Sequence, residues 1–128
     1  MKPEEIIEAR KRSMAMFKLG MKASSKAVHR TLNRPPKGKG WVQCMNSPAG
    51  VMCRPEGVRE AIAQFEKAYA IFPDVVARYQ IALHYEMIGE REAARQNFLL
   101  VKEQVEREAN PVYGAYLKAV ELALARLG

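Results

Sequence analysis

Apolar residues recur at helical spacing through the second half of this chain. Before Pro73, the apolar positions on one face of a 3.6-residue helix are Ile62, Phe65, Ala68, Tyr69 and Phe72. Pro73 lacks a backbone N–H and disfavours helix at the preceding residue, so this helix is predicted to end at Phe72. Asp74 can then cap the next helix through its carboxylate.

The same spacing continues to the end of the chain, interrupted by residues that end or begin helices. Gly89 is typical of a helix C-terminus, and Asn110 followed by Pro111 is typical of a helix start. The apolar faces of the three further helices contain Val75, Tyr79, Ala82, Leu83 and Met87, then Ala94, Phe98, Val101 and Val105, then Tyr113, Leu117, Val120 and Leu124. Because the turns are short, successive helices must run antiparallel. Residues 56–128 are therefore predicted to stack as helical hairpins.

Residues 1–34 predict one long amphipathic helix that begins near Pro3 and ends before the Pro35-Pro36 pair. Its apolar residues are Ile7, Met14, Phe17, Met21, Val28 and Leu32. Another face carries cations four residues apart, which are Lys18, Lys22, Lys26 and Arg30. Like charges at this spacing repel by a few tenths of a kcal/mol per pair. Either an anionic partner relieves this repulsion, or the long side chains extend over apolar surface into solvent.

Residues 35–55 interrupt the helical pattern and form the one segment with strand character. Two short apolar runs, 41–45 and 51–54, flank the turn sequence NSPAG, which predicts a short β-hairpin or an irregular loop. Trp41, set among Arg34, Lys37 and Lys39, can stack on a base or an aromatic side chain, or pack back on the domain.

Two stretches of the chain repeat with an offset of 33 residues. Ala61, Phe65 and Ala68 recur in kind as Ala94, Phe98 and Val101. Residues 56–101 resemble the tetratricopeptide repeat, in which an alanine, an aromatic residue, an alanine and a proline follow at gaps of four, three and five. Here these residues are Ala61, Phe65, Ala68 and Pro73.

The following helix continues the resemblance, with some departures. Positions that the family fills with an aromatic residue, a leucine, a small residue, a tyrosine and a turn glycine are Tyr79, Ile81, Ala82, Tyr85 and Gly89. Arg78 stands where the family usually has tryptophan, and the second repeat lacks its closing proline. Phe17, Leu19 and Gly20 resemble a repeat's first helix, so we expect a first repeat split by an insertion. The last helix resembles the helix that caps such stacks.

The resemblance implies an all-α fold of antiparallel helical hairpins in a TPR-like superhelix. Within one domain we expect a basic amphipathic helix (1–34), an irregular or hairpin-like insertion (35–55) and TPR-like repeats with a capping helix (56–128). The resemblance also implies a non-enzymatic protein–protein interaction module, an adaptor or a chaperone-type binder of peptides. Its groove would follow the first helices of the repeats, with the candidates Arg78, Gln80, Ile81, His84 and Tyr85.

Charge suggests an alternative function. The net charge is +7, and no acidic residue occurs between Glu8 and Glu56. Such asymmetry is typical of proteins with an anionic partner, although a solvated basic face also fits. The alternative is a nucleic-acid-binding protein, and a third possibility is that the basic helix contacts an acidic region of a protein partner. The residues assigned to an anionic contact are Lys18, Lys22, Lys26, Arg30, Lys37, Lys39 and Trp41.

Motifs of catalysis and metal binding are not evident in the sequence. There is no glycine-rich phosphate loop and no Ser-His-Asp order, so we expect no catalytic residue and no cofactor. Cys44 and Cys53 lack the close spacing of zinc ligands, so we expect no metal. No apolar run approaches the roughly 20 residues of a membrane helix, and the N-terminus does not resemble a secretory signal. We expect a cytoplasmic protein with reduced cysteines.

Two clear repeats are fewer than such stacks usually need for stability. We therefore expect either that the N-terminal helix completes the core or that two chains associate as a homodimer.

Overall fold

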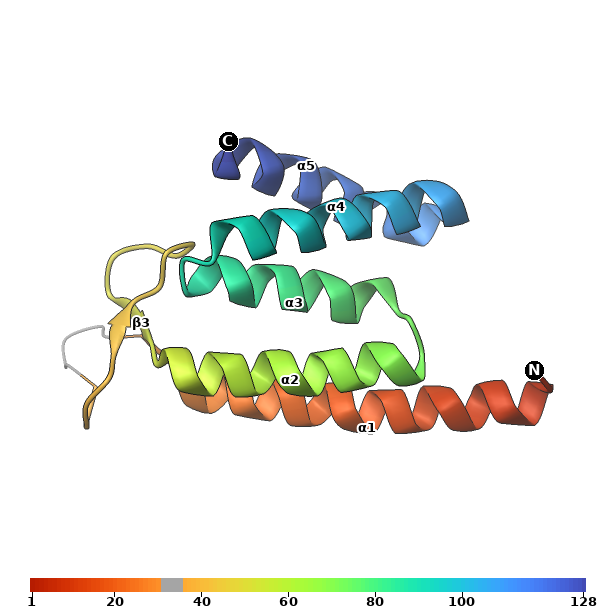
Figure 1. Cartoon of the computed structure of the whole chain (residues 1–128), viewed down its shortest axis with the longest axis horizontal. Helices are drawn as coiled ribbons and strands as arrows, with labels where there is room; N and C mark the ends of the chain where they lie inside the picture. The colour runs from red at the N-terminus through yellow and green to blue at the C-terminus, as the bar shows by residue number, and fades with distance from the viewer. Residues whose placement is uncertain (31–35) are drawn as a thin grey trace.

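A computed structural model describes residues 1–30 and 36–128 of the chain (Figure 1). This part of the chain is mainly helical and carries a small antiparallel sheet. The elements in order are α1 (Pro3–Ala27), β1 (Val28–Arg30), β2 (Val42–Gln43), β3 (Val51–Cys53), α2 (Pro55–Ile71), α3 (Val75–Met87), α4 (Arg91–Glu108), the 3₁₀ turn η1 (Pro111–Tyr113) and α5 (Gly114–Leu127).

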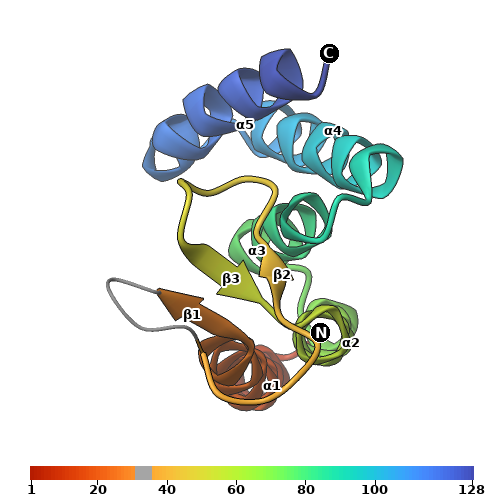
Figure 2. The ribbon, with the colours of Figure 1, turned by 90° about the vertical axis from the view of Figure 1, so that its left-hand side faces the viewer.

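The five helices stack in chain order, and each runs antiparallel to the one before it (Figure 1). Viewed along the helices, they form a zigzag with α1, α3 and α5 on one side and α2 and α4 on the other (Figure 2). The predicted boundary residues act as expected. The Asp74 carboxylate accepts a 2.8 Å hydrogen bond from the Val76 amide, and Asn110 caps η1 in the same way. Gly89 adopts φ +79°, a conformation that favours glycine.

Two apolar clusters fill the stack, one around each phenylalanine of the 33-residue repeat. Phe65 belongs to the first, between α1, α2, α3 and the sheet, and Phe98 belongs to the second, between α3, α4 and α5. Both side chains are fully buried, as their shared pattern predicts. Helix α1 completes the first cluster through Ala27 and the partly buried Phe17 and Ala23. The N-terminal helix therefore completes this core, as one of the two alternatives predicted from the sequence.

The N-terminal helix is shorter than predicted. It ends at Ala27, and Val28–Arg30 form β1, which pairs antiparallel with β3 through Val28↔Cys53 and Arg30↔Val51. Pairing with β3 satisfies backbone groups that a continued helix would have satisfied internally. Arg30 consequently lies on a strand, and only Lys18, Lys22 and Lys26 form the helical row. Leu32, Arg34 and Pro35, which the sequence placed in the same region, lie outside the described residues.

The packing face of α1 differs from the apolar face read from the sequence. Its buried residues are the small ones, Ala9, Ser13, Gly20 and Ala27. Ile7, Met14 and Met21 are about half exposed, at 56%, 52% and 44%. Small side chains occupy the buried face because they let α1 approach α2 closely. The larger Ile7, Met14 and Met21 remain on the open side of the helix.

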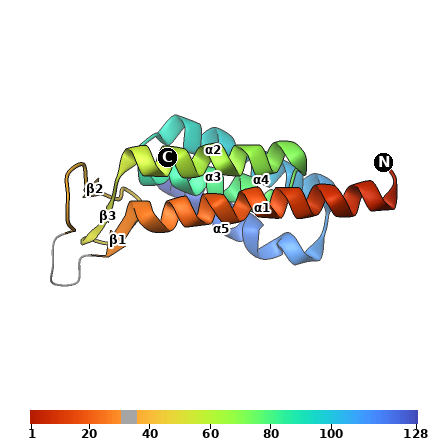
Figure 3. The ribbon, with the colours of Figure 1, turned by 90° about the horizontal axis from the view of Figure 1, so that it is seen from below.

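The insertion forms a three-stranded sheet in the order β1-β3-β2. Of the two alternatives left open by the sequence, the hairpin is present, because β2 pairs with β3 through Val42↔Cys53 and Gln43↔Met52. The third strand comes from the segment that was predicted to be helical. Figure 3 shows the strands together at one end of the helix stack, beyond the C-terminal end of α1. Backbone and side-chain hydrogen bonds attach the insertion to α3, from Met45 to the Met87 carbonyl and from Asn46 to the Leu83 carbonyl.

Among the helices described, none has both the length and the apolar character needed to cross a membrane.

We predict that Gly20→Ala destabilises the protein. An added Cβ would lie 2.6 Å from Cε1 of Phe65, whose ring is fully buried and cannot move aside freely. Overpacking of this kind costs about 1–3 kcal/mol, measurable by urea unfolding. The control is Gly114→Ala, where a Cβ meets no atom within 4 Å and φ is −57°. That variant should be neutral or up to about 1 kcal/mol more stable, and equal losses in both would contradict the close packing of α1.

Candidate binding surfaces

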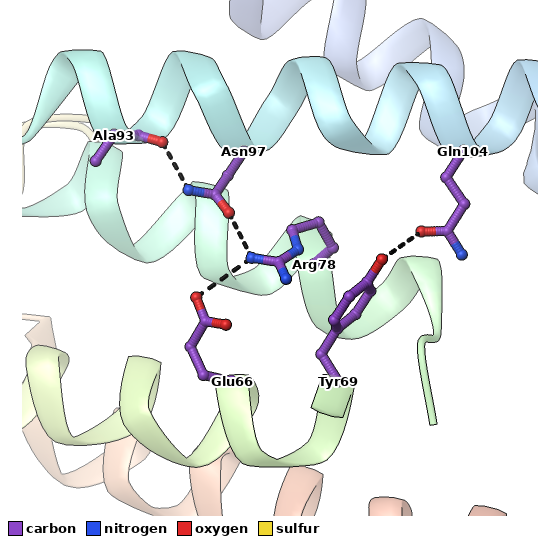
Figure 4. Close-up of polar contacts among 6 residues, drawn as sticks. All are labelled: Glu66, Tyr69, Arg78, Ala93, Asn97 and Gln104. Carbon is purple, nitrogen blue, oxygen red and sulfur yellow. Dashed lines mark hydrogen bonds and ion pairs between the residues drawn. The ribbon is translucent and has the colours of Figure 1, made fainter. Parts of the chain in front are cut away.

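Arg78 lies in a polar network that joins three helices, and not in an open groove (Figure 4). From α3, its Nη1 donates to Glu66 Oε1 on α2 at 3.2 Å and to Asn97 Oδ1 on α4 at 2.7 Å. Its guanidinium carbon lies 4.1 Å from the centre of the Tyr69 ring. The Arg78 side chain is only 12% exposed. The contacts therefore give Arg78 a structural role in place of the predicted partner contact.

The same network continues through amide side chains. Asn97 Nδ2 donates to the Ala93 carbonyl at 2.8 Å, which fixes the orientation in which its Oδ1 faces Arg78. The Tyr69 hydroxyl donates to Gln104 Oε1 at 3.2 Å, and Gln104 Nε2 donates to the Pro73 carbonyl at 2.9 Å. Buried polar groups on α4 thus hold the α2–α3 turn in place.

Two of the other four groove candidates are core residues, and Gln80 and Tyr85 are partly buried. Ile81 is fully buried and His84 is 3% exposed, so neither can contact a partner. Tyr85 packs against both apolar clusters, and the Gln80 carbonyl lies 2.7 Å from His84 Nδ1. The Ile81, His84 and Tyr85 side chains face inward because α3 is the central helix and packs against both α2 and α4. The groove residues assigned from the sequence therefore do not form a shared open surface.

His84 is held as a neutral ring inside the first cluster. Its Nδ1–H donates to the Gln80 carbonyl, which leaves Nε2 to accept from the Ser24 hydroxyl at 2.7 Å. The ring lies 5.1 Å from Phe65. Burial lowers the pKa of His84, although the hydrogen bond to Gln80 opposes this shift.

An open cleft lies between α1 and α3, beside the α2–α3 turn, and we name it the α1–α3 cleft. Its volume is about 610 Å³. The lining residues are Arg10, Ser13, Met14, Phe17, Phe72, Pro73, Asp74, Val76, Ala77, Glu108, Asn110 and Tyr113. None of them was among the site residues predicted from the sequence. The sequence did contain one indication of this cleft. The apolar face of α1, which includes Met14 and Phe17, has more large apolar residues than the packing of α1 on α2 requires.

Apolar and charged groups are both present in the α1–α3 cleft. Met14 and Phe17 face Val76 across it, with Arg10 placed over the Phe72 ring at 4.8 Å. Burial raises the pKa of Tyr113, and the nearby carboxylates of Asp74 and Glu108 raise it further. The phenol therefore stays protonated at neutral pH and can donate a hydrogen bond to a ligand in the cleft.

A second cleft, of about 860 Å³, lies between α1 and the start of α2 at the sheet end, and we name it the basic cleft. Its lining includes Lys22, Lys26 and Lys39, three of the residues assigned to an anionic partner. Arg54 also lines this cleft and was not among the residues predicted from the sequence. The other assigned cations, Lys18, Arg30 and Lys37, are exposed outside its lining. Glu56 and Glu60 line the same cleft.

Trp41 packs back on the domain, one of the two alternatives left open by the sequence. Its Nε1 donates to the Lys37 carbonyl at 3.0 Å, Arg54 lies over its ring at 4.6 Å, and His29 lies at 5.8 Å. Since both Arg54 and His29 already contact the ring, Trp41 is not an open platform for a base.

Cys44 and Cys53 are free and buried at the junction of the sheet with the first cluster. Burial raises the pKa of Cys44 to about 12, so its thiol is protonated and unreactive at neutral pH. Within residues 1–30 and 36–128, no three His, Cys, Asp or Glu side chains are grouped to hold a metal ion.

Comparison with known proteins gives no match to a family model, to a curated protein or to a solved structure.

We predict that Arg78→Met lowers the free energy of unfolding by about 1–3 kcal/mol, because Asn97 loses its donor inside the protein and Tyr69 loses its cation. Urea unfolding measures the change. The matched control is Arg59→Met, which removes an exposed ion pair with Glu90 and should cost less than about 1 kcal/mol. If Arg78→Met lowers the free energy of unfolding no more than Arg59→Met does, the network does not have the structural role assigned to it.

We also predict that stability decreases as the pH falls from 7.5 to 5.5. Because the folded-state pKa of His84 is below its value in the unfolded chain, the unfolded chain binds the proton more readily. The stabilisation is complete above the unfolded pKa of about 6.5 and is lost as the pH falls toward the folded pKa. Urea unfolding should show this decrease in the parent and in His29→Gln, and a smaller one in His84→Gln. The same decrease in all three proteins would contradict the buried neutral ring.

Proposed function

We propose that this chain is a TPR-like helical-repeat module that binds a segment of another protein in the α1–α3 cleft. In this proposal α1 and α2 are a first repeat split by the sheet insertion, α3 and α4 are the second repeat, and α5 is the capping helix. The zigzag of the helices supports it, because α1, α3 and α5 share one side of the stack (Figure 2). Proteins that the chain resembles bind peptides along this side.

The α1–α3 cleft is the observation that carries the proposal. It opens between the first helices of the two proposed repeats, and Met14, about half exposed, faces it. Exposed apolar side chains inside a concave, partly polar cleft are typical of peptide-binding sites. In this proposal the cleft takes the place of the groove residues inferred from the resemblance, of which Ile81 and His84 are buried and Arg78 lies in the polar network between helices.

The chemistry of the cleft defines the class of segment that it accepts. Met14, Phe17 and Val76 provide an apolar surface for one or two apolar side chains. Asp74 and Glu108 favour a basic group beside them, while Tyr113 can donate to a backbone carbonyl. We therefore propose an extended segment that combines an apolar anchor with a lysine or arginine. This function involves no catalytic step, and a reducing cytoplasm would suit the free Cys44 and Cys53.

The test is a selection of peptides from a displayed library against the full chain, followed by titration of the selected peptides. Met14→Glu should weaken binding about tenfold or more, since it places a charge where the apolar anchor lies. The fold should survive because Met14 is 52% exposed. Leu122→Glu, which changes a 59% exposed leucine on α5, is the matched control and should bind like the parent.

NMR then locates the bound peptide directly. Amide shifts should change at Met14, Val76 and Tyr113 on addition of a selected peptide. Shifts confined to another face, or full binding by Met14→Glu, would disprove this function for the cleft.

A further inference from the structure

The sheet end of the molecule carries a group of cations that the proposed protein-binding function does not use. They are Lys18, Lys22, Lys26, Arg30, Lys37 and Lys39, and none forms an ion pair with a described residue. Among residues 1–30 and 36–128, the arginines that form ion pairs are instead Arg59, Arg78 and Arg126. The fold gathers the cations because the C-terminal half of α1, the insertion and the start of α2 meet at one end (Figures 1 and 3).

The basic cleft places three of these cations, together with Arg54, around a common space. Lys22 and Lys26 are one turn apart on α1, Lys39 comes from the loop before β2, and Arg54 immediately precedes α2. The N-terminal end of α2 also opens into this space, since Pro55, Glu56 and Gly57 line it. The positive end of the helix dipole there adds to the field of the four side chains.

The loop that carries Lys39 is held in place before any ligand arrives. Arg54 Nε donates to the Lys39 carbonyl at 3.2 Å, and its Nη2 donates to the Lys37 carbonyl at 3.1 Å. The same guanidinium stacks on Trp41 at 4.6 Å. Gly38 adopts φ +95°, and a Cβ there would lie 2.2 Å from Arg54 Nη2, so glycine permits this close approach. Lys39 is therefore presented from an ordered backbone.

The acidic residues of the cleft restrict the kind of anion that fits. Glu56 and Glu60 lie among the four cations, which weakens the attraction for a single small anion. A linear polyanion can contact the cleft and also reach exposed cations outside it, such as Lys18 and Lys37. Because Trp41 is already packed between Arg54 and His29, it gives no stacking site for reading bases.

We propose that the basic end binds the phosphodiester backbone of nucleic acid without sequence preference, and that the basic cleft holds part of that backbone.

Fluorescence anisotropy with labelled single strands of about 20 nucleotides tests this proposal. Two unrelated sequences should bind equally, with affinity that falls steeply as salt rises. Parallel titrations with single-stranded DNA, single-stranded RNA and duplex DNA show which type of nucleic acid binds most tightly. The variant Lys22→Gln/Lys26→Gln/Lys39→Gln should bind at least about tenfold more weakly at low salt, and its log–log salt slope should fall by about two. Glutamine keeps helix propensity, and circular dichroism verifies the fold.

The matched control is Lys67→Gln/Lys102→Gln/Lys118→Gln, which removes the same charge from α2, α4 and α5 away from the cleft. It should stay within about threefold of the parent. Glu60→Gln should tighten binding, because it removes a carboxylate from the cleft lining. Met14→Glu should leave binding to nucleic acid within about threefold of the parent, which separates this site from the α1–α3 cleft.

Several results would overturn the proposal. Equal losses in the two triple variants would mean that only net charge matters. Competition by inorganic phosphate at equal phosphate concentration would assign the cleft to single anions. Weaker binding by Glu60→Gln would mean that the nucleic-acid backbone binds outside the basic cleft. If the parent protein does not bind nucleic acid at low salt, the proposed site does not exist.

Discussion

The contact of Phe65 with Gly20 is the constraint on which the rest of the molecule depends. The Phe65 ring lies where a side chain on Gly20 would otherwise be, so α1 and α2 approach closely. The ring also packs at 5.2 Å from Phe17 and 5.1 Å from His84, which brings α1, α2 and α3 together at one residue. Because Phe65 uses the small-residue face of α1, Met14 is left on the open side, where it lines the α1–α3 cleft together with the partly buried Phe17.

The second half of the stack repeats this plan with different side chains. Phe98 packs at 5.9 Å from Tyr79, which in turn lies 5.2 Å from Tyr116 on α5. Between the two aromatic centres, Arg78 joins α2, α3 and α4 by ionic and hydrogen-bonded contacts. Arg78 stacks on Tyr69, and the polar partners Glu66 and Asn97 fix its orientation. Those partners offset part of the cost of burying this cation, while the buried Arg78 Nε makes no hydrogen bond to a described residue.

The two clefts lie along different parts of α1 and differ in charge, because the α1–α3 cleft follows residues 10–17 and the basic cleft follows residues 19–27. The α1–α3 cleft lies beside the turns α2–α3 and α4–η1 and contains Asp74 and Glu108 with apolar side chains. The basic cleft lies beside the sheet and contains four cations. A protein segment and a nucleic-acid backbone could therefore be bound at the same time without competing for the same residues. The insertion is what makes the second cleft, since it supplies Lys39 and fixes it through Arg54.

The sequence by itself determined the helices after Glu56, because local rules set them. The proline after Phe72, the cap at Asp74, the glycine at 89 and the Asn110-Pro111 start act within a few residues of each boundary. The burial of Phe65 and Phe98 also followed from helical periodicity and from their shared pattern.

Tertiary structure alone decided which face of α1 is buried, where α1 ends and which residues line a cleft. Periodicity marked the apolar face of α1, but close packing against Phe65 selected Gly20 and close packing against Gly57 on α2 selected Ala27. Val28–Arg30 became a strand because β3, more than 20 residues away, supplied backbone partners. Likewise, the central position of α3 buried Ile81 and His84, and only the meeting of α1 with the insertion joined Lys22 to Arg54. These outcomes depend on contacts between distant segments, and no local pattern in the chain encodes which segments meet.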